Sequence, residues 1–164
     1  MQESRNVADH QSLIWNGNWA WSLPLILLTV ILHVMCLGVI NTWVVRALHR
    51  VRNRRHFITV FTLVMGFTTL LATILHAFEA AIWALSYRWL GALPDLASAM
   101  VYSLSAMTAY GHAEVFLQIH WRLMGALEAL NGLLLFGLTT AFLFSHIQRV
   151  WATQDSRWAE PRGQ

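Results

Sequence analysis

Charged residues are scarce in this sequence of 164 amino acids, and lysine is absent altogether. Only 12 % of the residues are charged while 57 % are hydrophobic, and the mean hydropathy is +0.49. This composition argues against a soluble globular domain and indicates an integral membrane protein. The positive charge comes from eleven arginines, five of them within 46–55. We attribute the pI near 9.8 to membrane topology, and we expect no nucleic-acid partner.

Cysteine and secretion signals are also lacking. Cys36 is the single cysteine and lies inside an apolar run, so the chain cannot form an intrachain disulfide. The first eighteen residues are polar and slightly acidic, without the basic start of a signal peptide, and no cleavable leader is expected. No span carries the regular arginines of a voltage sensor, and no stretch is long enough for an appended soluble domain.

What the chain does contain is long apolar runs. Residues 21–45, 57–90 and 120–150 are each long enough, at about 1.5 Å per residue, to cross the ~30 Å hydrocarbon core as a helix. A fourth apolar run, 94–107, begins with the helix-start residues Pro94 and Asp95. It reaches only ~20 Å, so it can enter a bilayer but cannot cross it.

Charge then predicts the topology. The arginine-rich loop 46–56 should be cytoplasmic, which places the segment 1–20 outside and the tail 151–164 in the cytoplasm. The short helix therefore dips in from the outer side, and the chain returns through the polar segment 108–114. Non-helical backbone at membrane depth is tolerated only where it is buried in protein or lines a water-filled path. This pattern favours a pore.

Two stretches resemble the pore module of the tetrameric potassium-channel superfamily. "AMVYSLSAMTA" (99–109) is similar to the family's pore helix, and "WRLMGALEALNGLLLFGLTTA" (121–141) is similar to its inner helix. The inner-helix positions that match are Arg122, Leu123, Gly132, Phe136, Gly137, Leu138, Thr140 and Ala141. The resemblance covers 57–150 and implies an all-α membrane fold. Each chain would hold an outer helix 57–90, a re-entrant pore helix 94–107, a filter 108–114 and an inner helix 120–150, and four chains would assemble. The span 21–45 is then an additional transmembrane helix.

The family filter reads T-T-V-G-Y-G-D, and two registers fit. One aligns Tyr110-Gly111 with Y-G but needs a deletion and an insertion. The ungapped register, which we prefer, lays these residues on the motif in order: Thr108, Ala109, Tyr110, Gly111, His112, Ala113 and Glu114. It keeps the first glycine as Gly111, replaces the second by Ala113 and removes a ring of threonine hydroxyls at Ala109. Because filters depend on rings of backbone carbonyls in conformations that glycine allows, we expect altered or weakened K⁺ selectivity.

Two residues of this segment carry further hypotheses. Four copies of Glu114 would form a cation-attracting ring at the outer mouth, although a solvated loop glutamate is the alternative. A ring of His112 would make conduction depend on pH between 5 and 8. A hydrogen bond from His112 to a pore-helix side chain is equally compatible with the sequence.

The third span contains polar residues and a candidate cavity face. Glu128 would support the filter from behind through Ser103, Ser105 or His112, or it would pair with Arg122. The candidate hinge and cavity residues, implied by the resemblance, are Gly132, Leu133, Phe136, Thr140 and Phe144. The alternative for this face is an ordinary helix-packing stripe.

The remaining membrane histidines offer an alternative of another class. His76 and Glu79 share a helix face and are expected to form a structural pair near the outer interface rather than a proton relay. His33 is expected to bind a backbone carbonyl or a neighbouring helix. His33 and His76 are also the one pair that could ligate a b-type haem in an electron-transfer subunit. When residues are counted from the arginine-rich loop, the two histidines differ in depth by about 12 Å, which argues against the haem alternative.

The sequence therefore predicts a pore-forming subunit of a homotetrameric cation channel, multi-pass in a bacterial inner membrane, and not an enzyme. Membrane lipid and monovalent cations are the expected partners, with K⁺ or Na⁺ in the filter, no other cofactor and no tightly bound metal. A non-conducting accessory subunit with the same fold is the main alternative.

Overall fold

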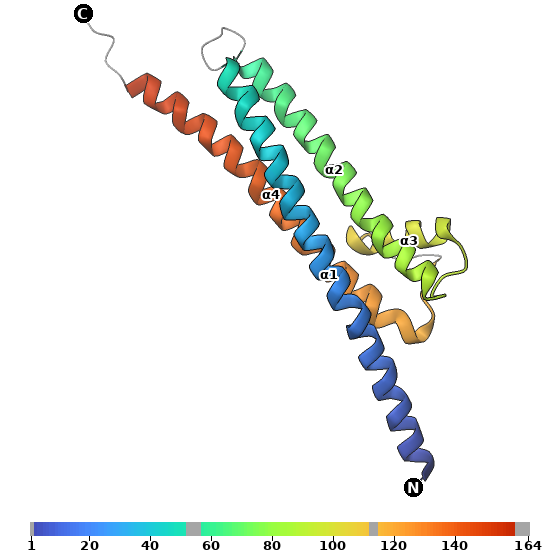
Figure 1. Cartoon of the computed structure of the whole chain (residues 1–164). Helices are drawn as coiled ribbons and strands as arrows, with labels where there is room; N and C mark the ends of the chain where they lie inside the picture. The colour runs from blue at the N-terminus through green and yellow to red at the C-terminus, as the bar shows by residue number, and fades with distance from the viewer. Residues whose placement is uncertain (1, 52–56, 112–114, 160–164) are drawn as a thin grey trace, which may run out of the picture.

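All regular secondary structure is helical in the residues that the structure, a computed structural model, describes: 2–51, 57–111 and 115–159, with side chains for 15–50, 57–111 and 115–151. The elements in order are α1 (Gln2–Val51), α2 (Phe57–Trp89), α3 (Leu96–Met107), the 3₁₀ turn η1 (Ile119–Trp121) and α4 (Arg122–Ala159) (Figure 1). Three helical segments are long and apolar enough to cross a membrane: Trp15–Arg50, Phe57–Trp89 and Ile119–Trp151. The prediction of an all-helical chain is confirmed for the described residues, and the three long apolar helices fit a multi-pass membrane protein.

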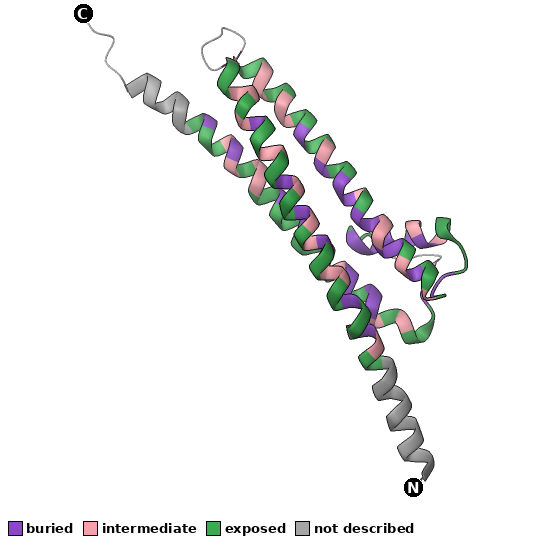
Figure 2. Cartoon of the chain, in the orientation of Figure 1, coloured by how far each residue is buried: buried purple, intermediate pink, exposed green. Residues whose placement is uncertain are grey.

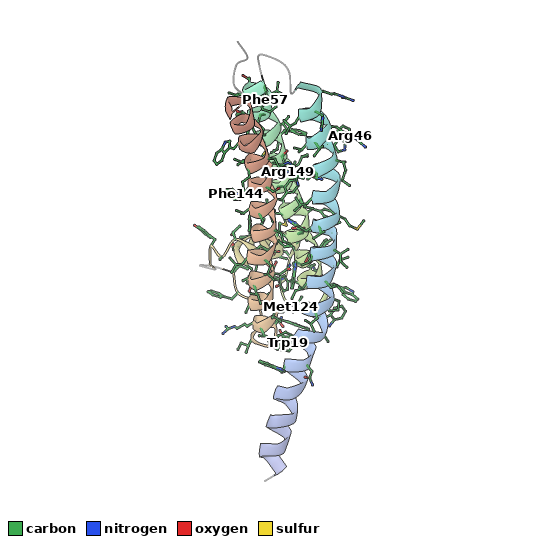
Figure 3. All side chains as sticks on the ribbon, turned by 90° about the vertical axis from the view of Figure 1, so that its left-hand side faces the viewer. Trp19, Arg46, Phe57, Met124, Phe144 and Arg149 are labelled. Carbon is green, nitrogen blue, oxygen red and sulfur yellow. The ribbon has the colours of Figure 1, made fainter. Side chains whose placement is uncertain are left out.

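The long helices form an open, elongated bundle. α1 and α2 run antiparallel side by side, while α4 crosses α1 and diverges from α2 toward its C-terminal end (Figure 1). The short helix α3 packs against both α2 and α4 near the end where α2 finishes and α4 starts. Trp19 and Met124 mark that end in Figure 3, and Arg46 and Phe57 mark the opposite one. α3 is therefore confined to one end of the bundle.

α1 is much longer than the sequence suggested. We expected a helix over 21–45 between an N-terminal segment 1–20 and a loop over 46–56, but the helix runs without interruption from Gln2 to Val51. No glycine or proline interrupts 46–51, and arginine is a good helix former, so the helix continues into the arginine-rich stretch. α4 likewise extends to Ala159, past the predicted end at 150.

α3 begins where the sequence signals a helix start, although its first residue is Leu96 rather than residue 94. Asp95 is the N-cap: its carboxylate accepts a hydrogen bond from the Ser98 amide at 2.9 Å and another from the Ser98 hydroxyl at 2.7 Å. These bonds hold the pKa of the Asp95 carboxyl below its ordinary value, and the bond from the Ser98 amide has the largest effect. The cap fixes the point at which the short helix starts.

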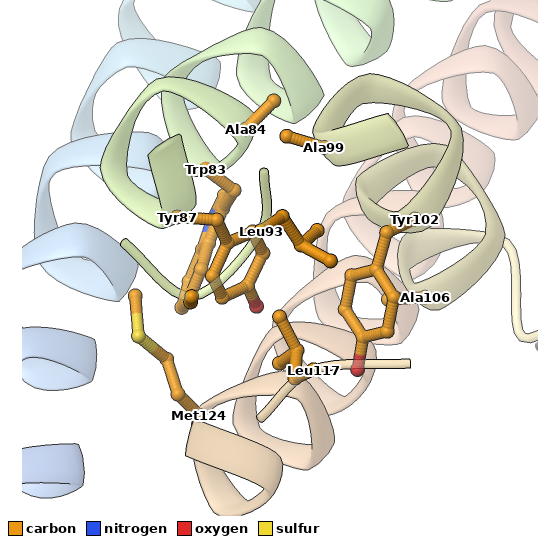
Figure 4. Packing of buried hydrophobic residues seen from close by; sticks show 10 residues of the cluster. Trp83, Ala84, Tyr87, Leu93, Ala99, Tyr102, Ala106, Leu117 and Met124 are labelled. Carbon is orange, nitrogen blue, oxygen red and sulfur yellow. The ribbon is translucent and has the colours of Figure 1, made fainter. Parts of the chain in front are cut away.

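The core lies between α2, α3 and the start of α4. Trp83 and Tyr87 of α2 are fully buried and pack with Tyr102 of α3 and Met124 of α4 (Figure 4). Small residues at the α2–α3 contact, Ala84 and Ala99 among them, are fully buried and let the helices approach closely. This packing is what fixes α3 against the long helices.

The outer surface of the bundle is apolar. Large hydrophobic side chains along α1 and α2, such as Met35, Trp43, Leu63 and Phe67, are exposed, and buried residues are confined to the facing sides (Figure 2). An apolar groove of about 600 Å³ also runs between α1 and α2, near the end of the bundle where α1 finishes and α2 begins. Such a surface is expected where the solvent is lipid.

Candidate functional site

The segment after α3 is shaped by the way the helix ends. The Tyr110 amide donates to the Ser105 carbonyl at 3.1 Å, and the Ala109 amide donates to the Ala106 carbonyl at 3.0 Å. These two bonds form a Schellman motif, whose C′ residue takes a left-handed conformation and is usually glycine. Here that residue is Ala109, with φ +54°, and Gly111 follows with φ +91°. The backbone therefore leaves α3 through two left-handed residues out of three.

The described part of the predicted filter faces outward from the single chain. Thr108, Ala109, Tyr110 and Gly111 are all exposed, Tyr110 to 86 %. Gly111 was predicted to retain the glycine conformation of the family filter, and its positive φ agrees with that expectation. His112, Ala113 and Glu114 lie outside the described residues, so the hypotheses about them stay predictions.

The strained cap at Ala109 can be tested directly. Ala109→Gly should stabilise the protein by about 1 kcal/mol, because the left-handed conformation is costly for a residue with a Cβ and free for glycine. The measurement is the free energy of unfolding in detergent micelles. A matched control is Ala106→Gly inside α3, which should destabilise by about 1 kcal/mol because its backbone is helical. A destabilising effect of Ala109→Gly would mean that this Schellman motif is not formed.

Glu128 is the centre of a buried hydrogen-bond network. Its carboxylate accepts a hydrogen bond from the Tyr87 hydroxyl at 2.6 Å and another from the Ser103 hydroxyl, and all three side chains are buried. The Ser103 hydroxyl also lies 2.7 Å from the Ala80 carbonyl. Glu128 thus joins α2, α3 and α4 at one point.

This network bears on the alternatives for Glu128. Of the candidate partners, Ser103 does bond to its carboxylate, whereas the Ser105 hydroxyl donates to the Val101 carbonyl of its own helix. Among the residues that the structure describes, no ion pair joins Glu128 to Arg122. Tyr87, the second partner, was not foreseen, because it lies on a different span and its position depends on how the helices pack.

Gly132, the predicted hinge, is a point of close helix contact. A Cβ at Gly132 would meet the Met107 backbone, with the Met107 Cα only 2.6 Å away, so the last turn of α3 rests directly on α4. The other predicted inner-helix residues are not buried within one chain: Leu133, Thr140 and Phe144 are exposed, and Phe136 is 38 % exposed. Phe136 stacks on the His76 ring, with centroids 4.1 Å apart.

A second polar cluster, which we call the histidine cluster, lies between α1, α2 and α4. It comprises His33, His76, Glu79 and Thr139, all of which are buried. His33 Nδ1 lies 2.9 Å from Glu79 Oε1, and His76 Nδ1 lies 3.3 Å from Glu79 Oε2. On the other side, the Nε2 atoms of both histidines lie 3.1 Å from the Thr139 hydroxyl. The pairing of His76 with Glu79 was predicted; its extension to His33 and Thr139 was not.

The predicted difference in depth between the two histidines is wrong. Their ring centroids are 5.1 Å apart, so they lie at the same level. The error came from starting the count at Arg46, whereas α1 continues to Val51. His33 lies 18 residues before Val51 and His76 lies 19 after Phe57, about 27 and 29 Å along their helices.

The haem alternative must therefore be judged on the rings themselves. His33 and His76 bind the same carboxylate on one side and the same hydroxyl on the other. Axial haem ligands must face each other across a porphyrin plane. Rings in contact, 5.1 Å apart by centroid, leave no room for one between them.

Further polar contacts attach α1 to the rest of the chain. Asn18 donates to the His120 carbonyl at 2.6 Å and accepts a hydrogen bond from the Met124 amide at 2.9 Å, so it caps the start of α4 from another helix. Further along α1 and α4, Asn131 donates a hydrogen bond to the Thr29 hydroxyl at 2.9 Å. Asn18 was missed, because a polar residue on one span does not by itself indicate its partner on another.

Comparison of the chain with models of known protein families, with curated proteins and with solved structures gave no match. What the site can do must therefore be argued from its own residues.

Proposed function

We propose that this protein is the pore-forming subunit of a homotetrameric cation channel, multi-pass in a bacterial inner membrane, with weakened selectivity for K⁺. The observation that carries the proposal is the position of α3. This helix is too short to cross a bilayer, its last turn rests on Gly132 in the first third of α4, and an exposed segment with two left-handed residues follows it.

Contacts along α3 support its placement at membrane depth. Ser103 lies against Ala80, nine residues before the end of α2, and Met107 lies against Gly132, ten residues after the start of α4. At ~1.5 Å per residue these positions are about 14 and 15 Å from the helix ends. That is about half of a ~30 Å hydrocarbon core, so the segment 108–111 would begin near the bilayer midplane.

The orientation of α3 also favours cations. The C-terminus of a helix carries a partial negative charge and a set of free carbonyl groups. Because α3 starts at the outer end of the bundle, this charge points toward the interior, where Thr108 begins the exposed segment. Polar backbone at this depth is tolerated only where it is buried in protein or lines water. Four chains around an axis would satisfy that requirement.

Closure by four chains explains the exposed faces as well. A chain with a single short helix and one segment 108–114 cannot enclose a pore alone, and cyclic symmetry supplies the other walls. Leu133, Thr140 and Phe144 on α4 would then line a cavity below the filter, with Phe144 as a hydrophobic constriction.

Ion flux into liposomes tests the proposal. The purified protein, reconstituted and exposed in turn to gradients of K⁺, Na⁺ and H⁺, should pass both K⁺ and Na⁺. Gly111→Ala should reduce the flux at least tenfold, because the left-handed conformation costs each of four alanines about 1–2 kcal/mol. The matched control is Gly66→Ala within helix α2, where a Cβ meets no atom within 4 Å and flux should be unchanged.

Two further variants test the predicted outer mouth in the same flux measurement. Glu114→Gln should lower cation flux, and His112→Ala should remove any change of flux between pH 5 and 8.

Crosslinking distinguishes the proposal from its alternatives. In a Cys36→Ser background, Tyr110→Cys should form disulfide-linked dimers under mild oxidation, because four copies meet near the axis. Trp43→Cys, which is also exposed but lies on α1, should not. Crosslinked tetramers that pass no ion would favour a non-conducting accessory subunit. A monomer, or copies of Tyr110→Cys that never crosslink, would overturn the channel proposal.

A further inference from the structure

We propose that His33, His76 and Glu79 bind one divalent transition-metal ion, with Zn²⁺ the best fit, inside the membrane-spanning bundle. The proposal does not depend on ion conduction. It concerns the histidine cluster, which lies between the first helix and the other two long helices, away from the segment 108–111.

The three side chains supply a suitable set of ligand atoms. One ligand atom from each of them, two imidazole nitrogens and a carboxylate oxygen, lies within 4.8 Å of the others, and all three residues are buried. Two histidines and one glutamate are a common Zn²⁺ ligand set, in which water completes a tetrahedral site. His33 Nδ1 lies 2.9 Å from Glu79 Oε1 and His76 Nδ1 lies 3.3 Å from Glu79 Oε2, so both nitrogens face the same carboxylate.

Thr139 orients both histidines in the way that metal binding requires. A metal-bound histidine usually donates a hydrogen bond from its second ring nitrogen to a neighbouring oxygen, which fixes the tautomer. Here the Nε2 atoms of His33 and His76 both lie 3.1 Å from the Thr139 hydroxyl oxygen, which has two lone pairs and can accept from both. Both Nδ1 atoms then present lone pairs toward the Glu79 carboxylate.

A count of protons shows that the cluster lacks a positive charge. Its four polar contacts need four protons, one in each. With Glu79 ionised and both histidines neutral, only three are present: one on each imidazole and one on the Thr139 hydroxyl. At least one contact must therefore bring two lone pairs together in an apolar environment, which is costly unless a cation lies there. A proton or a metal ion would meet this need.

The geometry favours the metal ion. A proton must lie on the line between donor and acceptor, whereas a metal ion can lie to one side of both ligand atoms. His76 Nδ1 and Glu79 Oε2 are 3.3 Å apart, yet both are buried without a hydrogen-bond partner. Their lone pairs converge without the alignment that a shared proton needs. A bound ion would also tie α1 to α2 directly, through His33 on one helix and His76 and Glu79 on the other.

The test is the metal content of the full-length protein in detergent, after incubation with Zn²⁺ and removal of excess metal on a chelating resin. The wild type should retain one ion per chain, and His33→Gln, His76→Gln and Glu79→Gln should each lose it. His146→Gln is the matched control, because His146 is also buried in a membrane-length helix but lies outside the cluster. Thr139→Val, which removes no ligand, should weaken the affinity about 10–100-fold.

A second measurement covers variants that fail to fold. Wild-type protein loaded with Co²⁺ instead of Zn²⁺ should show the visible absorption of a low-symmetry, four-coordinate ion, and Zn²⁺ should abolish it. A correctly folded wild type that holds no metal overturns the proposal and leaves an extra proton in the cluster. Metal that persists in folded Glu79→Gln, or that His146→Gln removes equally well, also overturns it.

Discussion

Replacing Glu128 by leucine should lower the free energy of unfolding by about 1–3 kcal/mol. The substitution leaves the Tyr87 hydroxyl without a partner in the interior, and a buried group left unsatisfied costs about 1–3 kcal/mol, whereas the Ser103 hydroxyl can still donate to the Ala80 carbonyl. Because Glu128 joins three helices, the loss should also release α3 from α4. The measurement is denaturant-induced unfolding in detergent, followed by tryptophan fluorescence, since Trp83 packs in the same core.

Glu128→Gln is the control that separates hydrogen bonding from charge. The amide oxygen can still accept from Tyr87 and the amide nitrogen can donate to Ser103, so this variant should fold with little loss of stability. If a carboxylate at this depth also supports cation conduction, Glu128→Gln should lose ion flux while retaining the tetramer. Equal stability of Glu128→Leu and the wild type would show that the network contributes nothing to folding.

The Glu128 network also illustrates what could be predicted from the sequence. The apolar lengths and the helix-start residues near Asp95 place α2 and α3 within two residues of their observed bounds, whereas α1 and α4 extend well beyond the predicted spans. The bond between Glu128 and Ser103 was one of the alternatives that the sequence offered, because a buried carboxylate needs a donor and few are within reach. Tyr87 did not follow, since it depends on the rotation of α2 about its own axis.

The histidine cluster shows where such reasoning fails. His33 and His76 were assigned different depths because the end of α1 was placed at the first arginines, whereas the helix continues to Val51. An error of a few residues at one boundary moves a side chain by about 1.5 Å per residue along the membrane normal. Contacts within one helix, such as His76 with Glu79, are insensitive to this error. Contacts between helices, such as His33 with Glu79, depend on it completely.

The segment 108–111 illustrates a third case, in which local backbone geometry replaces the expected residue type. A positive φ at Gly111 is ordinary for glycine, but the positive φ of Ala109 was not foreseen. It arises from the way α3 ends, because the Schellman motif demands a left-handed residue at that position whatever its type. A sequence without glycine there gives no sign of it.

Gly132→Val tests whether close approach of α3 and α4 holds the segment 108–111 at its depth. A valine Cβ would lie 2.6 Å from the Met107 Cα and would strike backbone, which cannot rotate away as a flexible side chain can. The last turn of α3 must then shift, and we expect a loss of at least about 3 kcal/mol in the free energy of unfolding. If the channel proposal holds, ion flux should be lost with it.

Gly137→Ala, five residues further along the same helix, is the matched control. A Cβ at Gly137 meets no atom within 4 Å, so the substitution adds no clash and should stabilise the helix by up to about 1 kcal/mol through its better propensity. Changes of opposite sign in the free energy of unfolding for the two variants would show that Gly132 is required for packing and not only for flexibility. If both substitutions were neutral, α3 would not rest on α4, and the depth inferred for the segment 108–111 would lose its support.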